Sequence, residues 1–493
     1  MSEKNSNEVV FLDERVTVGQ KVSFGIAGAG VSLLSGIING PLSVFYTFKL
    51  GLTTEKVALA MLIFAIWNAL NDPLFGILED KTQSKLGRRI PYLRYGAPVF
   101  GILFIFCWYP FLDLIFANRQ WALFANFLLA LFLFDTIFTI IGLITYSLPS
   151  EMCITGKGRA NVQVYSVYLG AIGMLGSMIL TTVFLSGTSS AISPWFRPTM
   201  IITAFVGSLM VFIPSFNLIE NEYAVREEKL GFFQSIVQTF KNTQFLIYEF
   251  GNFFYQIAWV VLTGLMAPFV GYVLGYEGIW ATIPLLAIFL MVFIFTFPAS
   301  RLARKWGNKR TYMVALSLSI VLFIELFIMS GKDSFFALIV MTLLGITYAP
   351  AALLNAPLYF EIIDMDELLT GKRRETTYAG MNALFTKPAI SAANALFFWV
   401  VGFFGFIEPT ELIPNPIQPE SAIFGIRLAY TVIPAAALLF VLFFMIFYKL
   451  HGPKWEEKKT KLNQIHLEKE QAYIEELAKE GKVSPTYKKL RRE

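Results

Sequence analysis

The sequence predicts an all-α membrane protein with twelve transmembrane helices arranged as two six-helix bundles. Three observations support this fold class: the high apolar content, the number of long apolar segments and a loop motif that occurs twice. Of the 493 residues, 56% are hydrophobic, and the mean hydropathy is +0.59. These values lie outside the usual range of soluble globular proteins. The chain is therefore expected to reside in a membrane.

Twelve apolar segments are long enough to cross a bilayer as helices. The residues before the first segment are polar and contain no hydrophobic signal region, so the first segment itself is expected to direct insertion. The segments lie at about 22–48, 57–79, 92–112, 120–148, 161–186, 197–217, 243–273, 278–300, 311–330, 334–360, 376–406 and 421–449.

A basic loop motif relates the two halves of the chain. KLGRR (Lys85–Arg89) follows the second segment, and KWGNKR (Lys305–Arg310) follows the eighth. Six helices in each half are typical of transporters that hold their solute between two bundles. We therefore divide the chain into an N-terminal segment, a first bundle, a linker, a second bundle and a charged tail. Their boundaries are 1–21, 22–217, 218–242, 243–450 and 451–493.

Basic residues are concentrated in the loops on one side of the predicted membrane. If the N-terminus is cytoplasmic, the cytoplasmic loops hold 18 Lys and Arg residues and the opposite loops hold 5. This asymmetry predicts a multi-pass protein of the cell membrane with both termini in the cytoplasm. It also accounts for the net charge of +5 without a nucleic-acid partner. Cys107 and Cys153 are expected to be unpaired.

The most informative ionisable residue is Asp72, which lies inside an apolar segment. A carboxylate at bilayer depth is costly, so such a residue usually has a function. Asn68, Asn71 and Asp72 stand at i, i+3 and i+4 and therefore share one helix face. A carboxylate with two amide oxygens can hold Na⁺, and Asp72 alone can take up a proton. A hydrogen bond to a neighbouring helix is the alternative explanation.

Three motifs resemble those of one transporter family. They are NDPLFGILEDKTQSKLGRR (Asn71–Arg89), FTIIGLITYSLPSEM (Phe138–Met152) and FEIIDMDELLTGKRRETTYAGMNALFTK (Phe360–Lys387). Together with the twelve segments, residues 20–450 resemble the glycoside-pentoside-hexuronide:cation symporters, the melibiose-carrier family of the major facilitator superfamily. The resemblance implies the major facilitator fold. It also implies a cation site to which Asp72, Asn71 and Thr139 contribute. Lys387 is implied to be the charged partner near that site.

Lys387 is unusual independently of this resemblance. An ammonium group inside an apolar helix should pair with a carboxylate or a dipole, unless its side chain extends to the membrane interface. The family commonly has an acid where this chain has Asn68, and the loss of one negative charge favours H⁺ over Na⁺. The first helix has no charge over residues 22–48, and Gly142 stands at an acidic position of the family's fourth helix. These departures argue against the usual galactoside solute.

Polar and aromatic residues on other helices are candidates for binding the solute. A polar stripe at i, i+3 and i+7 on the seventh segment, followed by a tryptophan, suits the recognition of hydroxyl groups. Hydrogen bonding between helices explains such stripes equally well. The fourth, fifth and eleventh segments add a carboxylate, three tyrosines and an amide. The full set is Glu249, Asn252, Gln256, Trp259, Asp135, Tyr165, Tyr168, Tyr378 and Asn382.

Charged residues in the cytoplasmic loops are candidates for a gate. Acidic and basic residues lie close together in sequence after the second segment and after the tenth segment. Ion pairs between these loops would close the cytoplasmic side, and a two-state carrier needs contacts that exist in only one state. The gate candidates are Asp80, Arg88, Arg89, Asp364, Glu367 and Arg373.

The sequence thus predicts a secondary symporter that couples a small polar, sugar-like solute to a cation by alternating access. Two alternatives remain: a lysolipid or amphiphile transporter of the same family, and a non-transporting receptor or scaffold on the same fold. An enzyme is not expected, because no nucleophile, base and orienting group converge in the sequence. We expect no cofactor, no metal other than Na⁺ as the alternative coupling ion, a surrounding of membrane lipid and a monomer.

Overall fold

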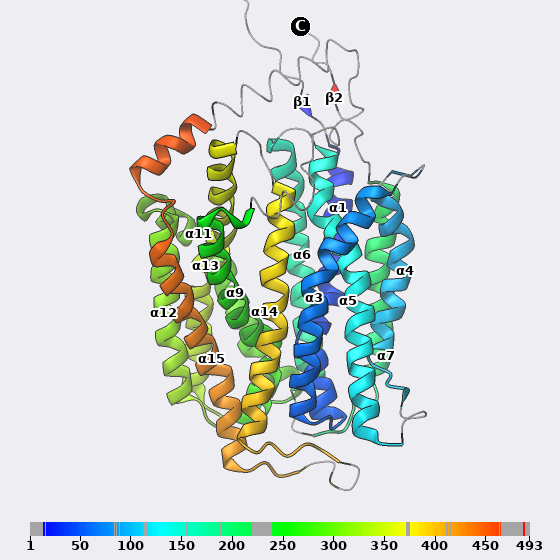
Figure 1. Cartoon of the computed structure of the whole chain (residues 1–493). Coiled ribbons are helices and arrows are strands. Elements are labelled where there is room, and N and C mark those ends of the chain that lie inside the picture. The colour runs from blue at the N-terminus through cyan, green and yellow to red at the C-terminus, as the bar shows by residue number, and fades with distance from the viewer. Residues whose placement is uncertain are drawn as a thin grey trace, which may run out of the picture.

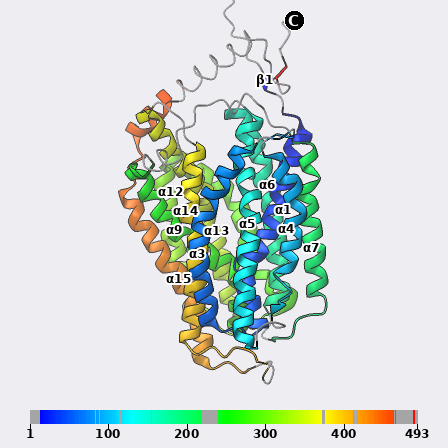
Figure 2. The same ribbon diagram turned by 45° about the vertical axis from the view of Figure 1, so that its right-hand side comes forward.

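The computed structural model is a helical protein whose long helices run side by side (Figure 1, Figure 2). Two short strands, β1 (Asp13–Glu14) and β2 (Tyr487–Lys488), pair antiparallel at one end of the molecule. We call the end of the long helices that lies away from these strands the distal end. The structure describes residues 13–14, 16–82, 84, 86–87, 89–112, 117–153, 156–186, 189–218, 239–370, 375–410, 413, 416–462, 464 and 487–488.

Helices in the N-terminal half coincide with the first six predicted segments. The first helix begins at a reciprocal cap, in which the Thr17 hydroxyl accepts from the Gln20 N–H at 3.2 Å and the Gln20 side chain accepts from the Thr17 N–H at 3.0 Å. The elements are α1 (Val18–Ile38), α2 (Pro41–Val44), η1 (Phe45–Lys49), α3 (Thr54–Lys81), α4 (Ile90–Phe106), α5 (Arg119–Met152), α6 (Gly156–Leu185), α7 (Phe196–Phe212) and η3 (Pro214–Phe216).

Helices in the C-terminal half coincide with the last six predicted segments. Asn242 caps the first of them, since its side-chain oxygen accepts from the N–H groups of Gln244 at 3.1 Å and Phe245 at 3.2 Å. The elements are α9 (Thr243–Gly264), α10 (Met266–Pro268), η4 (Phe269–Leu274), η5 (Gly278–Thr282), α11 (Ile283–Trp306), α12 (Asn308–Met329), α13 (Phe335–Thr370), α14 (Glu375–Phe403) and α15 (Glu420–Phe447).

Ten helical segments of the described chain are long and apolar enough to cross a membrane. The two remaining predicted segments correspond to α3, with 28 residues, and α4, with 17. Two predicted ends are wrong. α4 stops at Phe106 and not at 112, because the chain turns before Pro110. α13 continues to Thr370 and not to 360, because the loss of apolar residues marks where a helix leaves the membrane and not where its backbone hydrogen bonding ends.

Two long helices from different halves, α3 and α14, pack against each other, and they lie side by side in both views (Figure 1, Figure 2). α14 also contacts α9 and α15 within its own half, while α3 contacts α5. α14 is therefore the helix through which the C-terminal half meets the polar residues of the second and fourth segments.

Backbone segments of the two halves also approach closely at the distal end. A Cβ added to Gly40 would lie 3.0 Å from the Gly264 carbonyl oxygen, and one added to Gly264 would lie 2.8 Å from the Asn39 carbonyl oxygen. A Cβ added to Gly271 would overlap the carbonyl oxygen of Ser186. Glycine at these positions permits a backbone contact that any larger residue would prevent.

A side-chain contact between the halves accompanies these glycines. The Glu408 carboxylate, in the connection after α14, accepts from the Thr54 N–H at 2.9 Å and from the Thr54 hydroxyl at 3.0 Å. Thr54 begins α3, and Thr53 makes no side-chain cap, so a residue of the C-terminal half caps a helix of the N-terminal half. In this state the two halves meet at the distal end.

We predict that Gly271→Ala moves the two halves apart at the distal end, because the added methyl group would overlap the Ser186 carbonyl oxygen. A cysteine introduced at Thr54, which is 2% exposed, should then react faster with a membrane-impermeant thiol reagent. Gly331→Ala is the matched control, since a Cβ there meets nothing within 4 Å. Equal labelling rates in both variants would contradict the proposed role of the glycine contact.

Candidate functional site

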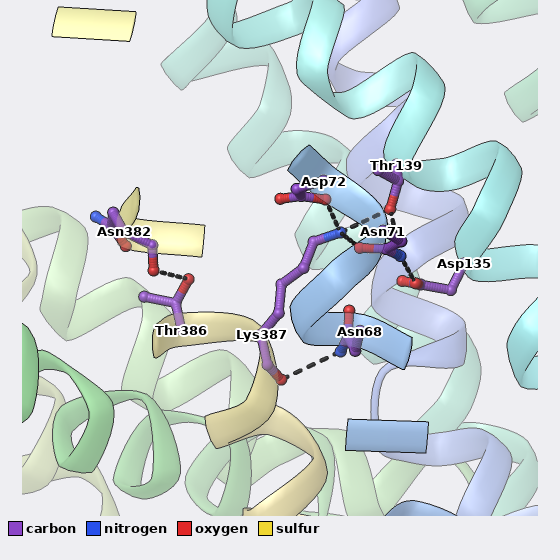
Figure 3. A network of polar contacts seen from close by, with 8 residues as sticks. All are labelled: Asn68, Asn71, Asp72, Asp135, Thr139, Asn382, Thr386 and Lys387. Carbon is purple, nitrogen blue, oxygen red and sulfur yellow. Dashed lines mark hydrogen bonds and ion pairs between the residues drawn. The ribbon is translucent and has the colours of Figure 1, made fainter. Parts of the chain in front are cut away.

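A cluster of buried polar side chains lies where α3, α5 and α14 meet (Figure 3). We call it the charge cluster, and it consists of Asp72, Asn71, Asp135, Thr139 and Lys387. α3 contributes the first two residues, α5 the next two and α14 the lysine. Asp72 is 5% exposed, Asp135 is 7% exposed and Asn71 is fully buried. The cluster therefore joins the two halves inside the molecule.

The Lys387 ammonium group has three oxygen partners, all from the N-terminal half. It forms an ion pair with the Asp72 carboxylate, donates to the Thr139 hydroxyl at 2.6 Å and donates to the Asn71 amide oxygen at 3.2 Å. Figure 3 shows the lysine side chain reaching across from α14 to these groups. An ammonium has three protons to donate, so its hydrogen-bonding capacity is met.

Asn71 holds the cluster together by using both ends of its amide. Its NH₂ group donates to the Asp135 carboxylate and to the Thr139 hydroxyl, the latter at 2.9 Å. Its oxygen accepts from Lys387. The prediction that assigned Asp135 to solute binding did not anticipate this contact, which brings the carboxylate into the charge cluster. One turn of α5 separates Asp135 from Thr139, so both side chains face α3.

Asn68 lies beside the charge cluster and also connects the halves. Its NH₂ group donates to the backbone carbonyl of Lys387 at 3.2 Å. Its side-chain oxygen is buried and has no hydrogen-bond partner among the described residues. Pro388 follows in α14 and has no N–H, so the helical hydrogen bond that is lost is the one to the carbonyl of Leu384, one turn earlier. The Asn68 contact to the Lys387 carbonyl is thus an additional hydrogen bond between α3 and α14.

Charge balance in the cluster depends on proton or cation binding. Two carboxylates and one ammonium carry one net negative charge when all three are ionised. A single proton or monovalent cation makes the cluster neutral. Net charge is expensive at this degree of burial, so occupancy should change the stability of the contact between α3 and α14. Asp135 supplies a second carboxyl group to the cluster, beside that of Asp72.

Three of the solute-site candidates form a second polar cluster in the C-terminal half. The Asn252 NH₂ group lies 3.5 Å from both the Glu249 carboxylate and the Asn382 side-chain oxygen. Asn355 on α13, which was not predicted, donates to the Asn252 side-chain oxygen at 3.2 Å. Tyr248 donates to the Asn355 backbone carbonyl at 3.0 Å. An amide inside the apolar segment 334–360 was the available signal for Asn355.

The other candidates for solute binding differ in exposure. Gln256 and Trp259 on α9 are half-buried, Tyr165 on α6 is half-buried and Tyr168 is 60% exposed. Tyr378 is fully buried, and its hydroxyl accepts from the Asn242 side chain at 2.9 Å, which ties the start of α9 to α14. That contact gives Tyr378 a packing function. Solute binding by these residues stays a prediction.

The structure describes the gate candidates in part. Arg89 forms a buried ion pair with Glu79 at 2.6 Å, within the N-terminal half. Asp364 and Glu367 lie on the last turns of α13 and not in a loop. Arg88, Arg373 and the side chain of Asp80 lie outside the described residues. A cytoplasmic gate formed by these groups stays a prediction.

Solved structures with a similar helix arrangement are transporters. The chain is similar to a D-xylose–proton symporter, with a TM-score of 0.60 and 14% identity, over 86% of this chain and 96% of that one. It is also similar to a mutant of the nucleoside transporter NupG, with a TM-score of 0.60 and 14% identity, over 87% and 100% of the two chains. This similarity shows the fold alone: the helices are arranged as in these transporters.

Sequence comparison identifies the family. The model of the MFS/sugar transport protein family matches residues 23–452, and the chain belongs to that family. Relatives include an uncharacterized symporter of Synechocystis (22% identical, 89% of this chain and 95% of the relative), a putative glycoside/cation symporter of Escherichia coli (21%, 90% and 94%) and a lactose permease of Lactobacillus helveticus (22%, 89% and 69%). The resemblance seen in the sequence motifs is confirmed.

We predict that Lys387→Ala destabilises the protein by about 3 to 5 kcal/mol, because it leaves two buried carboxylates without their ammonium partner. Adding Asp72→Asn should then cost no more than the worse single change, since the two residues form one unit. Thermal unfolding of the purified variants measures both effects. Lys332→Ala, at an exposed lysine, is the control. If the destabilisations caused by Lys387→Ala and Asp72→Asn simply add, the two residues do not act as one unit.

Proposed function

We propose that this protein is a cation-coupled symporter of a sugar, a glycoside or a similar small polar solute, and that it works by alternating access. The observation that supports this most directly is the charge cluster, in which a lysine of one half is bound by a carboxylate, a hydroxyl and an amide of the other. A charge contact between the halves lets cation occupancy alter how they pack. Family membership supports the same proposal.

Proton coupling is favoured over sodium coupling. Na⁺ prefers several oxygen ligands, and the oxygens of Asp72, Asn71 and Thr139 already surround the Lys387 ammonium. Sodium would have to displace that ammonium, whereas a proton needs only one lone pair on a carboxylate. This chain has Asn68 where the family commonly has an acid, and the loss of that negative charge also favours proton coupling.

Coupling would operate through the ion pair between α3 and α14. With Asp72 ionised, its attraction for Lys387 holds the two helices together. Protonation of Asp72 removes that attraction, leaves Lys387 without its carboxylate partner and favours a rearranged state with a different affinity for the solute. Asp135, held by Asn71, is the second carboxylate that could accept the proton.

Names of the relatives and the polar residues of α9 support a polar solute. The relatives include a lactose permease and an isoprimeverose transporter. In this chain, Gln256 and Trp259 are half-buried on α9, and an amide next to an aromatic ring suits the hydroxyls and the face of a sugar. Thermal stabilisation of the purified protein by sugars, glycosides and lysolipids in parallel would identify the solute class.

We further propose the membrane arrangement that the sequence predicts. It has twelve crossings in two six-helix bundles, 22–217 and 243–450, in a monomer surrounded by lipid in the cell membrane. With both termini cytoplasmic, the distal end faces outward. The contact between Glu408 and Thr54 would then close the outer side in this state.

We predict that Asp72→Asn abolishes uphill accumulation of the solute, because the coupling charge is lost, while exchange of solute across the membrane survives. Uptake and exchange by reconstituted vesicles measure the two activities separately. Glu420→Gln, an acid-to-amide change at an exposed residue at the start of α15, is the control. Accumulation at the wild-type level in the Asp72 variant would refute the proposal.

We predict that uptake follows a pH gradient and responds little to Na⁺ at constant pH. Asn68→Asp should create or strengthen sodium dependence, because it adds a carboxylate one turn before Asp72. Uptake measured over a matrix of pH and Na⁺ gradients tests both statements. Strict sodium dependence of the natural protein would show that the coupling ion has been assigned wrongly.

A further inference from the structure

The polar cluster of the C-terminal half contains a carboxyl group that the charge cluster does not use. We call this the amide cluster, and it consists of Glu249, Asn252, Asn355, Asn382 and Tyr248. Three helices, α9, α13 and α14, contribute to it. Each asparagine in it contacts another member of the cluster. Glu249 is the carboxylic acid of this cluster, and the other members are three amides and one phenol.

Glu249 lacks the partners that an ionised carboxylate needs. Its side chain is 0% exposed. One carboxyl oxygen lies 3.5 Å from the Asn252 NH₂ group, and the other has no hydrogen-bond partner among the described residues. Those residues include no Lys, Arg or His in an ion pair with it. A buried carboxylate without a cation is strongly disfavoured relative to the neutral acid.

Among the residues that the structure describes, the helices around Glu249 place no compensating charge beside it. α15 presents Val441 and Phe444 to this part of α9, and both are apolar. α13 contributes Asn355 and the phenol of Tyr359, which packs 5.8 Å from the Tyr248 ring. On α14 the neighbouring group is the neutral amide of Asn382. Phenols and amides cannot neutralise a carboxylate, so the proton stays with Glu249 in this state.

α14 connects this carboxyl group to the charge cluster. Asn382 belongs to the amide cluster, and its backbone carbonyl accepts from the Thr386 hydroxyl at 3.1 Å. Lys387 is the next residue, and its ammonium is held by Asp72, Asn71 and Thr139. Figure 3 shows Asn382 and Thr386 on the side of α14 away from α3. A shift of α14 that moves it relative to both α3 and α9 would also separate Asn382 from Asn252.

We propose that Glu249 is a second proton-carrying group of the transport cycle, located in the C-terminal half. In the present state its carboxyl O–H bond is intact. When α9 and α14 separate and water enters, the O–H bond breaks, the proton passes to a water molecule, and the hydrated carboxylate remains until it is reprotonated from water on the other side. This inference rests on the proposed proton-coupled symport, and it adds one proton to those carried with each solute.

Infrared spectroscopy tests the protonation state independently of transport. The purified wild-type protein at neutral pH should show a carbonyl stretching band of a neutral carboxylic acid that disappears in Glu249→Gln. The band should be retained in Glu420→Gln, where the acid is exposed at the start of α15. A spectrum that Glu249→Gln leaves unchanged in this region would show that Glu249 is ionised and would overturn the proposal, whatever the protein transports.

The proton count tests the role in the cycle. Reversal potentials of vesicles containing wild-type protein should give one proton per solute more than vesicles containing Glu249→Gln. Glu249→Asp keeps an ionisable group and should keep the wild-type count. An unchanged count in Glu249→Gln would show that Glu249 keeps its proton throughout the transport cycle. That result would overturn the proposal and leave Glu249 a structural role only. Wild-type accumulation by Asp72→Asn would instead refute the coupling site while leaving the infrared result intact.

Discussion

The contact on which the rest of the structure depends is that of the Lys387 ammonium with the oxygens of Asp72, Asn71 and Thr139. A charge at this depth is tolerated only when its protons are bound and an opposite charge lies next to it. Because the partners come from α3 and α5, the requirement sets how α14 packs against the N-terminal half. In the proposed function, this contact is the point at which the coupling cation acts.

The two halves meet by different physical means at different depths. Inside the molecule they share buried charge, and at the distal end they share glycine backbone contacts and the cap that Glu408 gives to α3. Backbone contacts and a single helix cap are cheaper to break than buried charges, which must be neutralised before they separate. This difference suits a carrier in which ion occupancy decides when the halves move and the distal contacts follow.

The sequence reveals residues whose chemistry conflicts with an apolar segment. Asp72 and Lys387 were recognisable without a structure, because an ionisable group within an apolar segment is visible in the order of residues alone. The helices were predictable for the same reason, since membrane crossings require long apolar segments. Their ends were less so: α13 passes ten residues beyond the predicted end at 360, to Thr370, because charge marks where a helix leaves the membrane and not where it stops.

By itself, therefore, the sequence determined the membrane class, the family and the two central charges. Only the tertiary structure decided which side chains meet across helices: Asp135 lies with Asn71, Tyr378 is buried against the start of α9, and Asn355 joins Asn252. The physical reason is that each helix can be rotated about its own axis. A helix turns by about 100° per residue, and when most of its faces are apolar, hydrophobic periodicity does not fix which face meets which neighbour. Packing of the complete bundle fixes it.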